Sequence, residues 1–330
     1  MAEMMKAILV NEDQRLYIGK CEKPVCGPYQ LLVRVEATAV NRADLLQKRG
    51  LYQAPVGASS ILGLEMSGVV EQVGEQVKGW EPGDRVVSLL DGGGYAEYVV
   101  ISADMGVHLP DQITYTEAAA IPEVFLTAYL NMIQLGKLQA GERVLIHAAA
   151  SGVGTAAIQM AKAVGAYVIA TSSTDEKCEM IDRLGADESI NYRNESIREE
   201  VLRLTHGTGV NLILDPVGAS YWNDNMEVLA VDGRIILYGA LGGSKVEELD
   251  IMPAMIKRIH IIASTLRSLP PERKAELTHT FVKWAMPLFR SNAIQPVIDS
   301  IWEAKEANEA HARMEANLNV GKIIILMDKL

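Results

Sequence analysis

Residues 144–154 constrain the fold of this chain more than any other stretch. The short apolar run at 144–146 is typical of a buried strand in a parallel sheet. Small residues follow at 148–154, and residues 155–161 have the composition of a helix packed closely on that strand. A small-residue turn that opens a helix offers free N–H groups and the positive end of the helix dipole, which together suit a pyrophosphate.

The turn is a variant of a known nucleotide-binding fingerprint, G-x-G-x-x-G, whose three positions hold Ala149, Ser151 and Gly154 here. The first two positions depart from the consensus glycines, but two small residues and the third glycine leave room for a phosphate. We therefore expect Ser151, Gly152, Val153 and Gly154 to contact a dinucleotide. The alternative is a tight strand–helix turn that binds no ligand.

The segment from 143 to about 265 alternates strands and helices, which predicts a doubly wound parallel sheet. Six strands are expected, at 143–147, 167–171, 189–192, 211–214, 234–238 and 260–264. A long helix is expected over 272–289.

The N-terminal part, to about residue 110, has the short strands and frequent turns of a compact barrel-like β domain. Its strands are expected at 7–10, 31–37, 68–74, 85–90 and 95–100. A capping box at Thr114 and Glu117 predicts a helix start, and after an interruption at Pro122 a second helix is expected over 125–135. The tail predicts a strand at 298–301, a helix at 304–315 and a final strand at 322–327 that returns to the first domain.

Composition excludes several classes of protein. The chain has 330 residues and a net charge of −11, without a block of Lys or Arg, so nucleic acid and anionic membranes are poor candidates for partners. Its three cysteines are few and odd in number, which indicates a reducing compartment, and Cys21 and Cys26 are too few for a structural zinc cluster. The first residues lack the apolar core of a signal peptide, and no apolar run reaches the length of a membrane span. We expect a cytoplasmic protein.

The tip of the second predicted strand favours NADPH over NADH. NAD-preferring sites carry an acid there, about twenty residues after the turn, but this chain has the neutral Ser172. Ser173 can donate a hydrogen bond to a 2′-phosphate, Lys177 can supply a charge, and Tyr192 can cover the same group. Alternatively, Lys177 is a solvated lysine in the first turn of a helix.

Four segments together resemble the zinc-free quinone oxidoreductases of the medium-chain dehydrogenase/reductase superfamily. They are Asn41-Arg42-Ala43-Asp44, Gly63-Leu64-Glu65, the turn at 148–154, and residues 212–218. The likeness covers nearly the whole chain and is closest to the tumour-suppressor-inducible quinone oxidoreductase branch, which also has Ser at the position of Ser151.

This resemblance implies a GroES-like catalytic domain at 1–124 and 290–330, and a Rossmann cofactor domain at 125–289. It also implies NADPH as the cofactor and a homodimer or homotetramer. The positions that bind catalytic zinc in metal-dependent relatives hold Asn41, Leu64 and Glu123 here. Without Cys or His in that set, we expect no metal site.

The candidate catalytic residues are Asn41, Tyr52 and Ser151. Asn41 either binds the nicotinamide ribose or the substrate oxygen, as the resemblance implies, or only caps a turn. Tyr52 either donates a hydrogen bond to a quinone oxygen or is an ordinary, partly exposed tyrosine. His147 is expected to be a core histidine. Further cofactor contacts are expected from Gly218, Tyr238, Gly239, Ala240, Leu241, Ser264 and Leu266.

The leading functional hypothesis is an NADPH-dependent quinone oxidoreductase that needs no zinc. Its substrate would be a small quinone or a related electrophile. Reduction of an enone or enoyl thioester is the alternative reaction. A protein that binds a nucleotide or RNA without turnover is the alternative of another class, and the net acidity argues against RNA.

Overall fold

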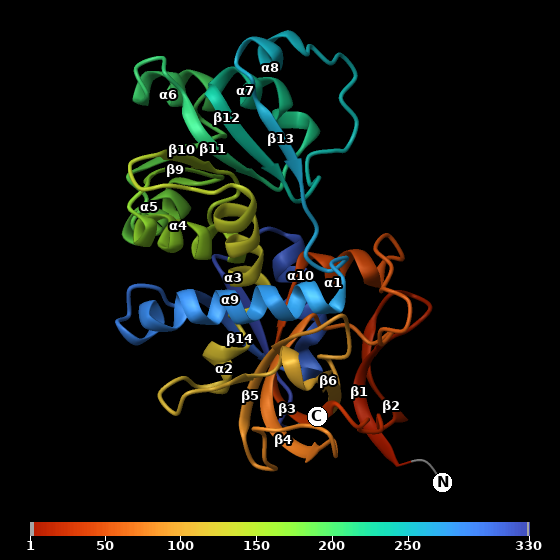
Figure 1. The fold of residues 1–330 in the computed structure, drawn as a ribbon. Helices are drawn as coiled ribbons and strands as arrows, with labels where there is room; N and C mark the ends of the chain where they lie inside the picture. Colours follow the sequence, from red (N-terminus) through yellow and green to blue (C-terminus); the bar gives the residue numbers. More distant parts are fainter. Residues whose placement is uncertain (1–2, 329) are drawn as a thin grey trace. The chain divides into compact units, whose positions relative to one another are not determined.

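The structure, a computed structural model, describes residues 3–328 and 330. The chain, coloured along its sequence in Figure 1, divides into two units that each contain several segments. The first unit contains the chain up to Val124, Arg267–Val282 and Pro296–Leu330, and the second contains Phe125–Leu266 and Lys283–Gln295. The long helix α9 (Pro271–Arg290) contributes residues to both.

A six-stranded sheet forms the centre of the second unit, with the order β10-β9-β8-β11-β12-β13. Every pair in it is parallel. Numbered along the unit, this is the order 3-2-1-4-5-6, in which ligands bind at the carboxyl edge where the strand order reverses. The doubly wound sheet expected from the sequence is confirmed. The strands are β8 (Arg143–Ile146), β9 (Tyr167–Ser172), β10 (Glu188–Asn191), β11 (Val210–Asp215), β12 (Leu229–Leu237) and β13 (His260–Ala263).

Helices connect these strands, and apolar side chains such as Leu145, Ile169 and Ile213 fill the core of the unit. The helical elements are η2 (Tyr129–Leu135), α4 (Gly152–Val164), α5 (Asp175–Arg183), α6 (Ile197–Leu204), η3 (Ala219–Tyr221), α7 (Trp222–Val228) and α8 (Met252–Ile256).

The helix expected over 125–135 begins earlier than its sequence suggests. Pro122 opens α3 (Pro122–Ala128) and does not interrupt it, because the first position of a helix needs no N–H donor. The same helical stretch continues as the π-helical segment η2. From Tyr115 to Leu135 the chain is long and apolar enough to cross a membrane, but 72% of its most apolar part is buried inside the structure. Such burial is typical of a core helix in a soluble protein.

The first unit is built on a seven-stranded sheet with the order β14-β15-β3-β4-β5-β7, in which β6 also pairs with β3. The strands are β3 (Gln30–Val40), β4 (Glu65–Val73), β5 (Arg85–Leu89), β6 (Tyr98–Ser102), β7 (Val107–His108), β14 (Ile298–Glu303) and β15 (Lys322–Leu326). A separate hairpin joins β1 (Met4–Val10) to β2 (Leu16–Glu22). The remaining helical elements are α1 (Arg42–Lys48), η1 (Ala103–Met105), α2 (Tyr115–Ala118), η4 (Ala304–Glu306) and α10 (Ala307–Glu315).

The elements of this unit that were not expected from the sequence include β2 and α1. The sequence of β2 has no apolar run, and this strand forms because it pairs with β1. α1 follows Asn41, where we expected only a polar turn; the backbone N–H of Asn41 donates to Asp44 Oδ2 at 2.8 Å and satisfies the helix start. The final strand β15 pairs antiparallel with β3, with Ile323 opposite Val40. This pairing brings the C-terminal tail to the end of the strand that precedes Asn41.

Candidate active site and cofactor site

Ser151 is the N-cap of α4, and this capping role was missing from the sequence analysis. Its Oγ accepts a hydrogen bond from the backbone N–H of Gly154 at 3.1 Å. A Cβ added to Gly154 would lie 2.4 Å from the carbonyl oxygen of Ala149, so only glycine lets the helix approach the turn this closely. Gly152 and Val153 form the first turn and are half-buried. The structure therefore has the tight turn and helix start that a pyrophosphate requires.

Ser172 ends β9, and its side chain is 3% exposed. Among the described residues its Oγ has no hydrogen-bond partner. β10 runs beside it, so that the N–H of Tyr192 donates to the carbonyl oxygen of Ser172 at 3.1 Å. Buried hydroxyl groups are nearly always paired, so this unpaired Oγ indicates a position for a polar ligand group.

Ser173 and Lys177 follow at the start of α5. Ser173 is half-buried, and the N–H of Lys177 donates to the cap residue Thr174 at 3.3 Å. The acid beside them, Asp175, accepts a hydrogen bond from Asn191 Nδ2 at 2.6 Å. The structure brings Ser172, Ser173, Lys177 and Tyr192 to one corner of the sheet, at the carboxyl ends of β9 and β10.

The other predicted cofactor residues follow β11, β12 and β13, at the carboxyl edge of the same sheet. Gly218 has a φ of 85°, in the region that glycine tolerates. Tyr238 has a buried hydroxyl without a partner among the described residues, and burial raises its pKa. The others range from exposed to buried: Gly239, Ala240 and Leu241 are exposed, Ser264 is half-buried and Leu266 is buried.

A buried polar chain, not expected from the sequence, supports this edge. His147 Nε2 lies 2.8 Å from Asn225 Oδ1, and Asn225 Nδ2 donates to Asp215 Oδ2 at 3.0 Å. Asp215 Oδ1 accepts from the N–H groups of Val217 and Gly218. His147 is fully buried, and burial lowers its pKa, so it is the core histidine that we expected. These hydrogen bonds fix the loop that carries Gly218.

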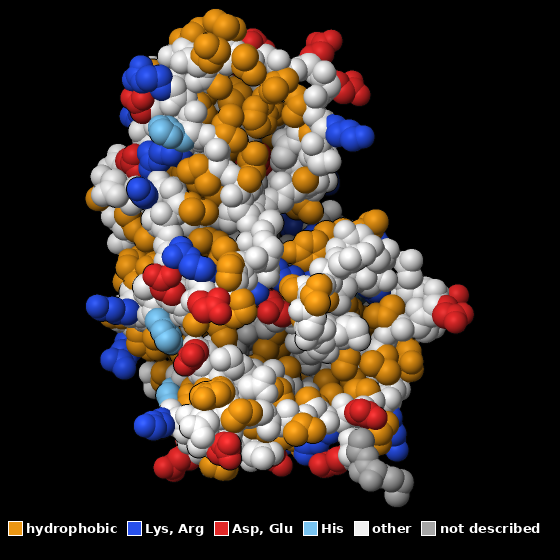
Figure 2. Space-filling view, turned by 45° about the vertical axis from the view of Figure 1, so that its right-hand side comes forward, with side chains coloured by type: hydrophobic (Ala, Val, Ile, Leu, Met, Phe, Trp, Pro, Cys, Tyr) orange, Lys and Arg blue, Asp and Glu red, His pale blue; other side chains and the backbone are white. Residues whose placement is uncertain are grey.

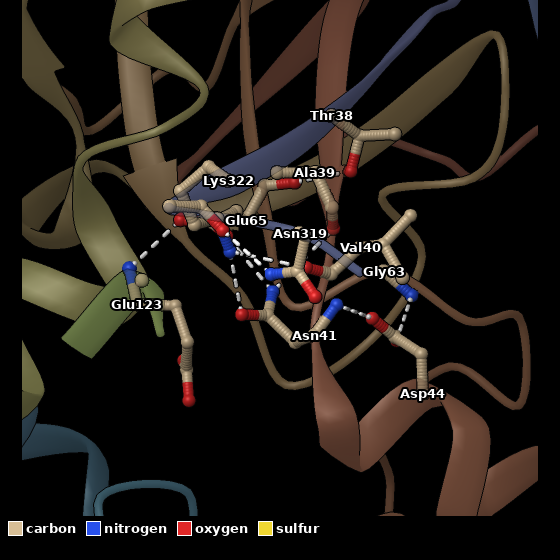
Figure 3. A network of polar contacts seen from close by, with 12 residues as sticks. Thr38, Ala39, Val40, Asn41, Asp44, Gly63, Glu65, Glu123, Asn319 and Lys322 are labelled. Atoms are coloured by element: carbon tan, nitrogen blue, oxygen red, sulfur yellow. Dashed lines mark hydrogen bonds and ion pairs between the residues drawn. The ribbon is translucent and has the colours of Figure 1, made fainter. Parts of the chain in front are cut away.

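In the first unit, Asn41 belongs to a buried network that Figure 3 shows. Its Nδ2 donates to Glu65 Oε1 at 2.8 Å, and its Oδ1 accepts from Lys322 Nζ at 2.7 Å. Lys322 also forms an ion pair with Glu65 Oε1 at 2.7 Å, and the two side chains are 3% and 0% exposed. The amide of Asn41 is thus held on both sides by charged neighbours from β4 and β15.

The carboxyl groups of Glu123 and Asp44 belong to residues that lie next to this network. The N–H of Glu123 donates to Glu65 Oε2 at 2.8 Å, and the Glu123 carboxyl group points away from the network (Figure 3). Burial and the neighbouring charge of Glu65 raise the pKa of Glu123 to about 8. Burial likewise raises the pKa of Asp44 to about 6, against two backbone hydrogen bonds that lower it. At neutral pH Glu123 is largely a neutral acid, which is the form that can donate a proton.

Tyr52 is half-buried, and the guanidinium carbon of Arg267 lies 5.2 Å from the centre of its ring. Arg267 was not among our candidate residues, although it directly follows the candidates Ser264 and Leu266 in the sequence. Lys322 was missed as well, although a single charge in the apolar stretch Lys322–Leu326 was a usable signal.

Comparison with known proteins agrees with this architecture. The chain matches the family described as alcohol dehydrogenase GroES-like domain over residues 27–111 and the family described as zinc-binding dehydrogenase over residues 152–283. A quinone oxidoreductase from Pseudomonas aeruginosa is 33% identical over 305 residues, which cover 91% of this chain and 92% of that protein. The chain belongs to the medium-chain dehydrogenase/reductase superfamily.

Two further members of the superfamily extend the comparison. The synaptic vesicle membrane protein VAT-1 homolog of Danio rerio is 31% identical over 321 residues; the match covers 93% of this chain and 66% of that protein, about two thirds of its length. A mycobacterial protein solved in complex with NADPH has a TM-score of 0.88 and 30% identity, with 98% of this chain and 100% of that chain covered. The resemblance to quinone oxidoreductases and the combination of a GroES-like and a Rossmann-type fold are confirmed, and the chain is an oxidoreductase.

The second unit fits the nicotinamide dinucleotide that the superfamily uses. The Ser151 turn would hold the pyrophosphate, and the unpaired hydroxyl groups of Ser172 and Tyr238 lie at the same edge of the sheet.

The first unit does not fit the zinc ion that one family description names. Of the corresponding residues, Leu64 is apolar and buried, and the oxygen of Asn41 is bound to the ammonium group of Lys322. Zinc prefers Cys, His and carboxylate ligands in a tetrahedral set. Within residues 3–328 and 330, no three His, Cys, Asp or Glu side chains are grouped to hold a metal.

Proposed function

We propose that this chain is an NADPH-dependent quinone reductase that works without zinc. The observation that carries the proposal is the contact between Lys322 and Asn41, because it fills a zinc-ligand position of the superfamily with an amide bound to a cation. An acceptor that needs no Lewis acid suits such a site. Quinones meet this requirement, since hydride addition leads to an aromatic hydroquinone.

The similarity to the Pseudomonas aeruginosa quinone oxidoreductase supports the quinone part of the proposal. When bound, NADPH supplies the hydride. The preference for NADPH is supported by Ser172, because a neutral residue at the end of β9 does not repel a 2′-phosphate. Lys177, Ser173 and Tyr192 are proposed as its neighbours.

The roles of individual residues follow from their surroundings. Ser151, Gly152, Val153 and Gly154 would bind the pyrophosphate. Asn41 is proposed to orient the reacting groups, since Glu65 and Lys322 fix its amide. Tyr52 is proposed to donate a hydrogen bond to the quinone oxygen. The remaining proposed cofactor contacts are Gly218, Tyr238, Gly239, Ala240, Leu241, Ser264 and Leu266.

We also propose a cytoplasmic homodimer, or a homotetramer built from it. β13 is the edge strand of its sheet, and its Ile261 is 46% exposed. Next to it in the chain, Met252, Met255 and Ile256 of α8 are 53%, 64% and 68% exposed. Figure 2 shows hydrophobic side chains gathered on the surface of the second unit. An open strand edge beside apolar side chains is usually covered, and a second copy would cover it.

A steady-state assay of NADPH oxidation tests the proposed reaction. We expect turnover with para-benzoquinone and an ortho-naphthoquinone, and much less with enones or enoyl thioesters of similar size. Faster turnover of enoyl thioesters would replace quinone reduction with the alternative reaction. Tight NADPH binding without turnover of any acceptor would indicate a protein that binds nucleotides without catalysis.

A further inference from the structure

Arg267 is a buried arginine with an unusual set of partners. Its Nη2 donates to the backbone oxygen of Asp91 at 2.6 Å and to Gln47 Oε1 at 2.8 Å, and its Nε donates to the same Asp91 oxygen at 3.2 Å. The residue is only 6% exposed. Among the described residues, no carboxylate forms a salt bridge with it, and its hydrogen bonds go to neutral oxygens.

The third nitrogen of the guanidinium group has no partner. Nη1 is buried and makes no hydrogen bond to any residue that the structure describes. A buried charged donor without a partner is costly, because it has lost its hydration and gained nothing in return. Two nitrogens are therefore used to hold the side chain in place, and one is left to bind something else.

Tyr52 covers this guanidinium group, with its ring centre 5.2 Å from the Arg267 carbon. Tyr52 lies in a segment without helix or strand, and its neighbour Leu51 is 71% exposed. A planar guanidinium group stacks well on aromatic rings. A flat quinone ring beside Tyr52 can contact the same guanidinium group and bring an oxygen atom to Nη1.

Glu123 belongs to the same electrostatic environment. The charge of Arg267 lowers its pKa, although burial and Glu65 have larger effects and raise it. Burial raises the pKa of the Tyr52 phenol, so this group remains protonated at neutral pH. Near Arg267 the first unit thus contains a cationic donor, a phenol and a neutral acid.

We propose that Arg267 is a catalytic residue whose Nη1 binds the oxygen atom that becomes negatively charged when the acceptor is reduced. The inference rests on the proposed quinone reduction and names the group that replaces a Lewis acid in it. The hydride of NADPH, which becomes NADP⁺, is transferred to one carbonyl oxygen of the quinone; the π electrons shift through the ring to the other carbonyl oxygen, which becomes the phenolate, and a proton from Glu123 or water completes the hydroquinone. A preorganised donor aimed at this oxygen lowers the barrier, because Nη1 is already buried and fixed when the charge forms.

The first experiment compares Arg267→Met with wild type. We expect kcat for para-benzoquinone to fall about 100-fold, as for loss of an oxyanion donor, with a smaller change in KM. NADPH affinity, measured by fluorescence titration, should stay within about twofold because Arg267 is not assigned to the cofactor. Arg273→Met is the matched control, since Arg273 lies on the surface and pairs with Glu276; its kcat should equal that of wild type.

A second readout does not depend on turnover. para-Nitrophenolate resembles the anionic product, and para-nitroanisole has nearly the same shape without the charge. In titrations in the presence of NADP⁺, Arg267→Met should bind the phenolate at least about tenfold more weakly than wild type and the anisole equally well. Equal weakening of both would mean that Arg267 only shapes the pocket, and the proposal would be wrong.

Arg267→Lys keeps the positive charge. It serves as a second variant in case Arg267→Met does not fold. Lysine can replace one contact to Asp91 or Gln47, but it cannot hold that contact and also present the fork of Arg267 to the acceptor. We expect it to fold and to lose about tenfold in kcat. If wild type reduces quinones and both variants retain its kcat, the role of Arg267 is refuted while the proposed function stands. If wild type reduces no quinone, the proposed function itself fails.

Discussion

At the scale of single residues, many side chains in the candidate sites have a structural task beside the proposed chemical one. Ser151 caps a helix, Asn41 bridges a buried ion pair, and two nitrogens of Arg267 hold a loop. A substitution at such a position changes stability as well as binding. Each variant must therefore be compared with a second variant that loses the same structural contact.

Ser151 permits such a comparison. Ser151→Ala and Ser151→Val both remove the cap of α4, so each should lower the free energy of unfolding by about 0.5–2 kcal/mol. Only Val adds a branched side chain beside the proposed pyrophosphate. Fluorescence titration with NADPH should show most of the affinity lost in Ser151→Val and little lost in Ser151→Ala. Equal affinities would mean that the side chain does not face the cofactor.

Lys177 tests the choice between the two nicotinamide cofactors. Loss of a charge-assisted contact to a 2′-phosphate costs about 1.5–3 kcal/mol. Lys177→Ala should therefore raise the KM for NADPH about 10-fold to 100-fold and leave the KM for NADH nearly unchanged. Arg183→Ala, at the exposed end of the same helix, should change neither value. Equal effects of Lys177→Ala on both cofactors would assign it a surface role.

At the scale of elements, a buried polar contact joins α10 to Tyr95 within the first unit. His311 is fully buried, and its Nε2 lies 2.9 Å from the hydroxyl oxygen of Tyr95. Burial lowers the pKa of His311 from 6.5 to about 3, so the folded protein holds it neutral while the unfolded chain protonates it below pH 6.5. The stability that this residue contributes is complete above pH 6.5 and is lost as the pH falls toward 3.

This linkage predicts how stability depends on pH. Between pH 6.5 and pH 5 the free energy of unfolding should fall by about 1.6 kcal/mol through His311 alone. Urea unfolding at both pH values should show this loss in wild type and in His279→Gln, whose histidine is exposed. His311→Gln can still accept a hydrogen bond from Tyr95 and should show a smaller loss. The same acid sensitivity in His311→Gln would mean that another group is responsible.

At the scale of the whole molecule, the absence of a zinc requirement is the broadest consequence of the proposal. Purified protein should retain its NADPH-dependent quinone reduction after prolonged treatment with a chelator. Elemental analysis of the active protein should find no stoichiometric zinc. Loss of activity on chelation, together with loss of one bound zinc per chain, would contradict the proposal.

A charged substitution on β13 tests the proposed contact between two copies of the chain. Ile261→Lys places an ammonium group on the open edge of β13 and should convert the dimer to monomers in analytical ultracentrifugation, because a buried unpaired charge is strongly unfavourable. Val25→Lys, at a position 88% exposed in the first unit, is the control and should leave the mass unchanged. A wild-type protein that is monomeric at every concentration would refute the contact.

The sequence by itself determined the parallel sheet of the second unit and the turn at Ser151. Both are encoded locally: apolar runs of strand length alternate with helices, and small residues stand where a strand meets a helix start. The same local signals located Ser172 at the end of β9, and the resemblance of four short segments to zinc-free quinone oxidoreductases identified the superfamily.

Only the tertiary structure decided the polar centre of the first unit. Asn41 and Lys322 are 281 residues apart and meet because β15 pairs with β3, and Arg267 reaches Asp91 across 176 residues. No periodicity in the sequence records such contacts. Sequence alone also predicts the wrong exposure for a buried charge. Lys322 and Arg267 are residue types that usually lie on the surface, but the fold buries both. The parallel sheet and its strand–helix turn could therefore be predicted, whereas the group that we propose to replace a Lewis acid could not.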